Sequence, residues 1–160
     1  MSRRGAELAL LLLGGFRTFA DSATAELAAR GYPDVRPVHD FALQAILTGA
    51  DNASELGRRM SVTKQTAAKT IAVLEERGYV AREPDPTDGR RMRLQVTDRG
   101  HAMLREGEAI FDELRERWEK QAGADAVGNV ERTLQRLLGQ DTIRLDKPPG
   151  WLLQDLGNDG

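Results

Sequence analysis

The segment that decides the fold runs from Ser54 to Val96 and reads SELGRRMSVTKQTAAKTIAVLEERGYVAREPDPTDGRRMRLQV. Its pattern predicts a short helix over 53–60, a tight turn, a second helix over 64–77 and then a two-stranded hairpin. Leu56, in the first helix, lies four residues before a methionine, so these two side chains share a buried face. This order of elements is typical of a winged helix-turn-helix.

Polar side chains mark where these helices begin and end. Asn52 and Glu55 are three residues apart, which is the spacing of a capping box, so we expect Asn52 to cap the first helix. Thr63 is expected to cap the second helix, because its hydroxyl can accept a hydrogen bond from a free backbone N–H of the first turn. Gly78 is expected to end that helix in a left-handed conformation.

The second helix has one apolar face and one polar face. Ala67, Ile71 and Leu74 recur at spacings of four and three residues and are expected to be buried. The opposite face carries Gln65, Lys69, Ala72 and Glu76, flanked by Thr66 and Ala68. Glutamine can pair with adenine, and a lysine ammonium with guanine or phosphate. We therefore predict base readout by Gln65, Thr66 and Lys69, although an ordinary solvated helix face carries the same residue types.

The hairpin is predicted to have strands over 79–83 and 91–96, with a stiff tip between them. The tip contains two prolines, two aspartates and a glycine, which are turn-forming residues. Arg90 and Arg91 stand at its end, where arginine side chains can reach a narrow minor groove.

The two aspartates of the tip, Asp85 and Asp88, would repel phosphate if they were free. We therefore expect at least one of them to pair with a nearby arginine and to hold the tip in shape. The alternative is an exposed, charged hairpin that contacts no DNA.

Long helices are expected on both sides of this segment. The first covers 6–30, and its leading half is apolar on nearly every side because Leu10, Leu11 and Leu13 add to the stripe formed by Leu8 and Leu12. A helix that is apolar all round must be covered on several faces, and a partner subunit could supply that cover. A plain core helix is the alternative.

Further helices are predicted to start at Pro37 and to cover 99–121, beginning after a Thr97 cap, and 125–138. The chain is thus expected to be mainly α-helical, with roughly six helices and a small β-hairpin wing. It forms one domain of 160 residues: a winged lobe over 51–98, and a helical dimerisation region over 1–50 and 99–160. In the C-terminal tail, Trp151 beside two leucines is expected to dock on the rest of the chain.

The net charge of -2 conceals a charge asymmetry. Residues 54–105 hold 11 basic and 7 acidic side chains, whereas residues 106–160 hold 7 basic and 12 acidic ones. A basic segment within an acidic protein is expected where one face meets phosphate. Phosphate contacts are predicted for Arg58, Arg59, Lys64 and the wing, and double-stranded DNA is the predicted partner.

Other functional classes find little support. The chain has no cysteine, which excludes disulfides, thiolate metal sites, cysteine nucleophiles and thiol redox sensing. Two histidines give no expected metal site, and we expect no cofactor. With no glycine-rich phosphate loop and no clear acid–base constellation, an enzyme is the weakest interpretation. Glu7 interrupts the early apolar run, which is too short for a membrane span, so a cytoplasmic protein is expected.

At this point the chain resembles the multiple-antibiotic-resistance regulator (MarR) family of bacterial transcription factors, over about residues 6–138. The most specific similarity is the wing and the start of the helix after it: Asp85-Pro86-Thr87-Asp88-Gly89-Arg90-Arg91, then Leu94, Val96, Thr97 and Gly100. The end of the second motif helix is also similar: Leu74-Glu75-Glu76-Arg77-Gly78-Tyr79-Val80. The chain departs from the family at Gly57, where alanine is usual, and in its longer tail over 140–160.

The resemblance implies a homodimer formed by the first, fifth and sixth helices. It implies two recognition helices in successive major grooves of a pseudo-palindromic operator, with Thr63 at the start of each helix, and wings in the flanking minor grooves. It also implies a pocket for a small aromatic or lipophilic effector, with Phe16, Phe19, His39 and Phe41 as candidate lining residues, and release of a repressor when that ligand binds. Ordinary core packing is the alternative for those four residues.

Two other interpretations stay open. One is a winged-helix protein that binds DNA without responding to a ligand. The other is a protein-interaction module whose DNA surface has been put to another use.

Overall fold

The computed structural model describes residues 2–141 together with Ile143 and Arg144. The described elements are, in chain order, α1 (Arg4–Ala29), α2 (Pro37–Leu47), α3 (Ala53–Met60), α4 (Lys64–Glu76), β1 (Val80–Pro84), β2 (Met92–Val96), α5 (Asp98–Ala122), α6 (Ala124–Leu138) and the 3-10 helix η1 (Gly139–Asp141). The predicted mainly helical winged fold is confirmed. The expected docking of Trp151 lies outside the described residues.

The predicted caps are present. Asn52 Oδ1 accepts a hydrogen bond from the backbone N–H of Glu55 at 2.9 Å and begins α3. Thr63 Oγ1 accepts from the N–H of Thr66 at 3.1 Å and begins α4. Thr97 does the same for α5. Each cap satisfies a backbone donor that the helix itself leaves free, so local chemistry sets these boundaries.

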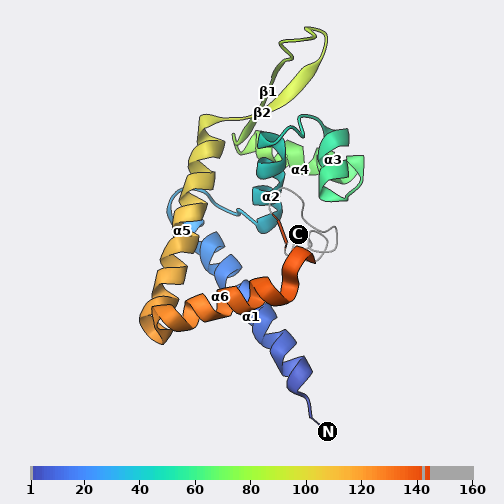
Figure 1. Cartoon of the computed structure of the whole chain (residues 1–160). Coiled ribbons are helices and arrows are strands. Elements are labelled where there is room, and N and C mark those ends of the chain that lie inside the picture. The colour runs from blue at the N-terminus through green and yellow to red at the C-terminus, as the bar shows by residue number, and fades with distance from the viewer. Residues whose placement is uncertain (1, 142, 145–160) are drawn as a thin grey trace.

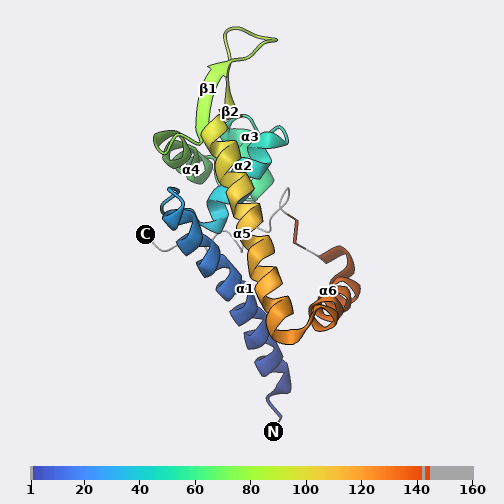
Figure 2. The same ribbon diagram turned by 90° about the vertical axis from the view of Figure 1, so that its left-hand side faces the viewer.

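The elements form a winged lobe at one end and a helical region at the other (Figure 1). The lobe consists of α2, α3, α4 and the β1–β2 hairpin, which projects away from the N-terminus. The strands pair antiparallel, with Val80 opposite Val96 and Glu83 opposite Arg93. Helix α5 leads from the lobe into the helical region and α1 lies beside it, as Figure 2 shows from a second direction, while α6 turns back from the end of α5.

The hydrophobic core lies in the lobe and along the start of α5. Its largest fully buried side chains are Tyr79, Leu43, Leu56, Met60, Ile71, Leu74, Met103 and Ile110. Gly100, in the first turn of α5, lies against the end of α4 and the hairpin. A Cβ there would be 2.7 Å from Val96 Cγ1 and would overlap the carbonyl oxygen of Tyr79. Only glycine therefore lets α5 pass this close to the hairpin.

Gly57, the departure from the family pattern, has a similar explanation. It is buried in α3, and a Cβ there would lie 3.0 Å from the carbonyl oxygen of Val62 and 3.2 Å from that of Thr63. Glycine costs about 1 kcal/mol of helix propensity relative to alanine, but here it lets α3 sit directly against the turn that precedes α4.

The leading half of α1 is not covered by the rest of the described chain. Only Ala20, Ala23 and Leu27 of this helix are buried. The leucines of its first half are all exposed: Leu8, Leu10, Leu11, Leu12 and Leu13. None of the described helices is long and apolar enough to cross a membrane. The exposed leucines are thus an apolar surface that the described part of the chain leaves uncovered.

Candidate DNA interface

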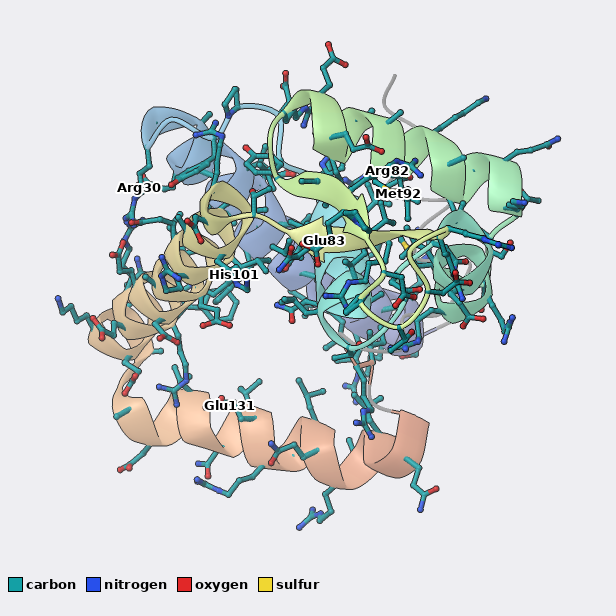
Figure 3. All side chains as sticks on the ribbon, turned by 90° about the horizontal axis from the view of Figure 1, so that it is seen from above. Arg30, Arg82, Glu83, Met92, His101 and Glu131 are labelled. Carbon is teal, nitrogen blue, oxygen red and sulfur yellow. The ribbon has the colours of Figure 1, made fainter. Side chains whose placement is uncertain are left out.

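Helix α4 presents its predicted polar face to solvent. Ala67, Ile71 and Leu74 are buried as predicted. The residues proposed to meet DNA are exposed: Thr63, Lys64, Gln65, Thr66 and Lys69. In the view along the wing, the α4 side chains extend outward from the body of the lobe (Figure 3). Ala68 and Ala72 are also exposed and add little side-chain bulk to this face.

The two threonines at the start of α4 act together. Thr63 Oγ1 donates to Thr66 Oγ1 at 2.9 Å while accepting from the Thr66 N–H. The Thr66 hydroxyl therefore keeps its own proton available as a donor. Thr63 stabilises the first turn of α4, and Thr66 retains a free polar function on the exposed face.

The two arginines of α3 are engaged differently. Arg58 pairs with Glu55 at 2.7 Å and is largely exposed, so its guanidinium stays near the surface. Arg59 is directed to the end of α2, where it donates to Thr48 Oγ1 at 2.7 Å and to the Thr48 carbonyl at 3.0 Å. Arg59 thus satisfies an otherwise free helix carbonyl and ties α3 to α2, a role that its sequence position does not indicate.

The tip of the wing is held by its aspartates, but through a different contact from the predicted one. Asp85 Oδ1 accepts from Thr87 N–H at 2.9 Å and from Thr87 Oγ1 at 2.7 Å. Asp88 Oδ1 accepts from the N–H of Arg90 at 3.1 Å. Within the described residues neither carboxylate forms an ion pair, so the predicted pairing with an arginine side chain is wrong. Groups two residues away reach the carboxylates without ordering a long side chain.

Those contacts also affect ionisation. The two hydrogen bonds from Thr87 are the main cause that lowers the pKa of Asp85, and the nearby charges of Arg93 and Arg91 act in the same direction. The carboxylate is therefore ionised, and able to accept both hydrogen bonds, at neutral pH.

Ion pairs fasten the base of the wing. Arg93 Nη2 lies 2.7 Å from Glu83 Oε1 across the strand pair. Arg91 lies 3.8 Å from the carboxylate of Asp51, whose carbonyl also accepts from the N–H of Leu94 at 2.8 Å. The segment before α3 thus runs beside β2, and the wing is attached to the helix-turn-helix.

Three acids of this face are paired with arginines, and several cations have no acidic partner among the described residues. Glu55, Glu75 and Glu83 are each paired with an arginine. By contrast, no ion pair within the described part of the chain engages Lys64, Lys69 or Arg90, and all three are exposed. The face formed by α4 and the wing therefore offers positive charge that the protein itself does not satisfy.

A small cavity lies away from this face, among α1, α2 and α5. Its volume is about 140 Å³, and its wall is mostly apolar. Of the predicted ligand residues, Phe16 and Phe41 line it. Phe41 also belongs to the buried core.

His39 has a structural role that the sequence did not indicate. It is buried, and its Nδ1 accepts from the backbone N–H of Arg36 at 2.9 Å at the start of α2. Burial, together with the positive charges of Arg77 and Arg36, lowers the pKa of this imidazole to about 4. His39 is therefore neutral and can act as an acceptor across the physiological pH range.

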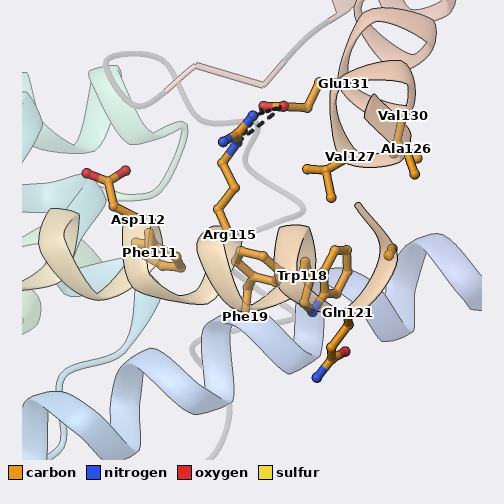
Figure 4. Close-up of a pocket in the computed structure, with 11 residues that line it drawn as sticks. Phe19, Phe111, Asp112, Arg115, Trp118, Gln121, Ala126, Val127, Val130 and Glu131 are labelled. Atoms are coloured by element: carbon orange, nitrogen blue, oxygen red, sulfur yellow. Dashed lines mark hydrogen bonds and ion pairs between the residues drawn. The ribbon is translucent and has the colours of Figure 1, made fainter. Parts of the chain in front are cut away.

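Phe19 lines a different and larger cavity of about 490 Å³, between α1, α5 and α6 (Figure 4). Its ring meets Trp118 edge to face at a centroid distance of 4.8 Å and stacks on Phe111 at 6.3 Å. An ion pair of 2.6 Å between Arg115 and Glu131 joins the two walls. The four predicted ligand residues therefore do not gather in one pocket. Within the described residues, no group of three His, Asp or Glu side chains is placed to hold a metal ion.

Part of this chain is similar in sequence to known proteins. Residues 41–91 match the model of the MarR family. A stretch of 85 residues is 33% identical to the LexA repressor of Deinococcus radiodurans, covering 51% of this chain and 38% of that protein. The chain thus spans about two fifths of that relative.

Solved structures with the same fold cover most of this chain. A variant of MepR from S. aureus bound to an oligodeoxyribonucleotide is 16% identical, with a TM-score of 0.60 over 84% of this chain and 98% of that one. YusO from Bacillus subtilis is 20% identical, with a TM-score of 0.65 over 84% of this chain and 94% of that one. The reduced form of MarR from E. coli is 22% identical, with a TM-score of 0.64 over 82% of this chain and 96% of that one. At these identities the likeness shows a shared fold.

Proposed function

We propose that this chain, whose residues 41–91 match the model of the MarR family and which has a winged-helix fold, is a homodimeric transcriptional regulator that binds a specific site in double-stranded DNA. The observation that carries the proposal is the exposed face of α4 and the wing, where Lys64, Lys69 and Arg90 have no ion pair among the described residues. Unpaired cations on a convex, protruding surface are suited to phosphate. The MepR variant of the same fold is bound to an oligodeoxyribonucleotide.

Different residues of this face have different tasks. Lys64 and Arg58 contact phosphate and supply affinity and salt dependence, as do Arg90 and Arg91 on the wing. Gln65, Thr66 and Lys69 reach base edges in the major groove and supply sequence preference. Arg59 contributes through the fold, because its guanidinium is engaged at the end of α2.

A second copy of the chain covers the apolar surfaces of the helical region. Leu10, Leu11 and Leu137 are each more than 60% exposed, which is unfavourable for leucine in water. The larger cavity, lined by Phe19 and Trp118, lies beside α6 (Figure 4). Its apolar wall can bind the leucine-rich first half of α1 from the second copy. In the dimer, two copies of α4 enter successive major grooves, about ten base pairs apart.

We further propose that the protein is a repressor that a small aromatic ligand releases from DNA. The cavity among α1, α2 and α5 lies where the helical region meets the lobe. A ligand there releases DNA only if it binds more tightly to a dimer whose recognition helices are wrongly spaced.

The test is a gel-shift titration with DNA that flanks the gene of this protein, in the wild type, Gln65→Ala and the exposed α6 control Arg136→Ala. The wild type and the control are expected to retard the same fragment with equal affinity. Gln65→Ala is expected to lose sequence preference while keeping the salt dependence, because it removes a base contact and no charge. Failure of the wild type to bind any duplex at low salt would reject DNA binding and favour a protein-interaction module.

The dimer is tested separately by light scattering. A particle of twice the chain mass of 17.7 kDa is expected at micromolar concentration. A stable monomer there would contradict the proposed covering of α1.

A further inference from the structure

The cavity among α1, α2 and α5 has a size that limits its ligand. Its volume is about 140 Å³, and a cavity of roughly 150 Å³ is enough for one benzene molecule. Phe16, Phe41 and Phe111 contribute aromatic surface to the wall, and aliphatic side chains from α1 and α5 supply most of the rest. The cavity therefore suits a ligand with a single aromatic ring.

The wall also contains a carboxyl group that no cation satisfies. Asp40 lines the cavity from α2 and is only partly accessible to solvent. No ion pair within the described residues engages it. Burial raises its pKa to about 6, and the negative charge of Glu108, on α5, acts in the same direction; a hydrogen bond from Gln44 opposes the shift. Asp40 thus places a carboxylate without an ion pair in the wall of an apolar cavity, whereas Glu108 is exposed and lies outside that wall.

The other polar residues of the wall do not neutralise that charge. Thr24 is already committed, because its hydroxyl donates to the carbonyls of Ala20 and Val35 at 3.1 and 3.0 Å. Arg36 lines the cavity too, but its charge acts on His39, whose pKa it lowers, and it forms no ion pair with Asp40 within the described chain. Among the described residues no cation neutralises Asp40, so the cavity favours a ligand that brings a positive charge.

We propose that this cavity binds a ligand made of one aromatic ring and a cationic nitrogen, with the ring among the phenylalanines and the nitrogen facing Asp40. The aromatic faces add to this preference, because a cation is attracted to them. An aromatic acid of the same size would bring a second carboxylate beside that of Asp40. The inference names the ligand class for the proposed ligand response, and it does not depend on DNA binding.

The test uses three probes of nearly equal size: benzylamine, which is cationic at pH 7, benzyl alcohol and benzoate. Their affinities for the full-length protein are measured in the absence of DNA by chemical-shift titration of the backbone amides. In the wild type, benzylammonium is expected to bind at least tenfold more tightly than benzoate. Its shifts are expected to cluster around Phe41 and Met103.

Two variants test which carboxylate causes the preference for benzylammonium over benzoate. Asp40→Asn is expected to remove most of the preference, since it keeps the shape of the side chain and removes its charge; Glu108→Gln is expected to reduce it less. Asp112→Asn, the matched control, removes a carboxylate that lies instead at the larger cavity, and it is expected to retain the wild-type preference. Circular dichroism checks that each variant is folded.

Three results would overturn the proposal: benzoate binding as tightly as benzylammonium, an unchanged preference in folded Asp40→Asn, or shifts clustered around Trp118 instead. A protein that prefers benzylammonium but binds no duplex would refute the proposed DNA binding alone. A protein that binds its operator but prefers benzoate would refute this inference alone.

Discussion

Replacing Asp85 with alanine separates two physical effects at the wing that predict opposite changes in DNA affinity. The carboxylate accepts two hydrogen bonds from Thr87, at 2.9 and 2.7 Å, and so fixes the turn that presents Arg90 and Arg91. Removing it loosens the tip. The same change also removes a negative charge close to the phosphates, which by itself would strengthen binding.

The expected magnitudes decide the sign. The two hydrogen bonds from Thr87 fix the turn, so DNA binding must restore the order that their loss removes. The single charge of an exposed carboxylate acts on a phosphate through water, and salt screens that repulsion. The loss of order therefore outweighs the loss of repulsion, and the affinity is expected to fall by about fivefold.

The assay is fluorescence anisotropy with an operator-bearing duplex at fixed salt, comparing wild type, Asp85→Ala and Asp85→Asn. The asparagine variant keeps an acceptor oxygen for Thr87 and loses the charge, so it is expected to bind as tightly as the wild type or more tightly. Alanine is expected to bind more weakly than both. If alanine matched asparagine and bound at least as tightly as the wild type, charge alone would explain the tip and the reasoning from its hydrogen bonds would be refuted.

Three further predictions concern the wing, the core and pH. Arg90→Ala is expected to weaken operator binding and to lower the slope of log affinity against log salt by about 0.9 for each copy of the wing on DNA, since one phosphate neutralisation is lost. Its thermal stability, measured by circular dichroism, is expected to stay unchanged. An unchanged salt slope would argue against a phosphate contact. Gly100→Ala is expected to destabilise the fold by about 1–3 kcal/mol in urea titrations, because its Cβ overlaps the Tyr79 carbonyl oxygen; full stability would show that α5 can shift at no cost. The pKa of His39 is lowered to about 4, so the contribution of its neutral form to stability is lost as pH falls from about 6.5 to 4. The pKa of Asp40 is raised to about 6, so the unfavourable ionisation of its carboxyl group is relieved as pH falls from about 6 to 4. The two effects offset each other in the wild type, and Asp40→Asn is expected to lose stability more steeply with acid than the wild type in urea titrations at pH 6.5 and 4.5; parallel losses would contradict the opposed shifts.

Features set by a few neighbouring residues were predictable from the sequence. Asn52, Thr63 and Thr97 cap their helices as expected, because a side-chain oxygen needs only an N–H three residues further on. The buried face of α4 follows from helical periodicity alone. The exposed leucines of α1 agree with an apolar pattern too broad for one chain to bury.

Features that depend on the choice among several partners were not predictable. Asp85 had arginines nearby in sequence, yet it bonds to Thr87, because the shorter contact orders less side chain. Arg59 is one residue from an exposed arginine, but the approach of α2 directs it to Thr48. Only the packed arrangement of helices shows which end of another element a long side chain can reach.

The candidate ligand residues show the same limit at the level of helix faces. Phe16 and Phe19 are one helical turn apart, yet they line different cavities: Phe16 shares its cavity with residues of α2 and α5, and Phe19 shares its cavity with residues of α5 and α6. His39 was a plausible polar contact by sequence, but it is used to begin its own helix. Asp40, the next residue, carries the unpaired charge and has no sequence motif to mark it.

The most direct test of the central claim, that α4 reads a specific DNA sequence as part of a dimer, is selection of bound duplexes from a random-sequence library by the full-length protein. We predict enrichment of an inverted repeat whose half-sites lie about ten base pairs apart, centre to centre. Recovery of duplexes with no shared motif, or of no duplex at all, would contradict the account.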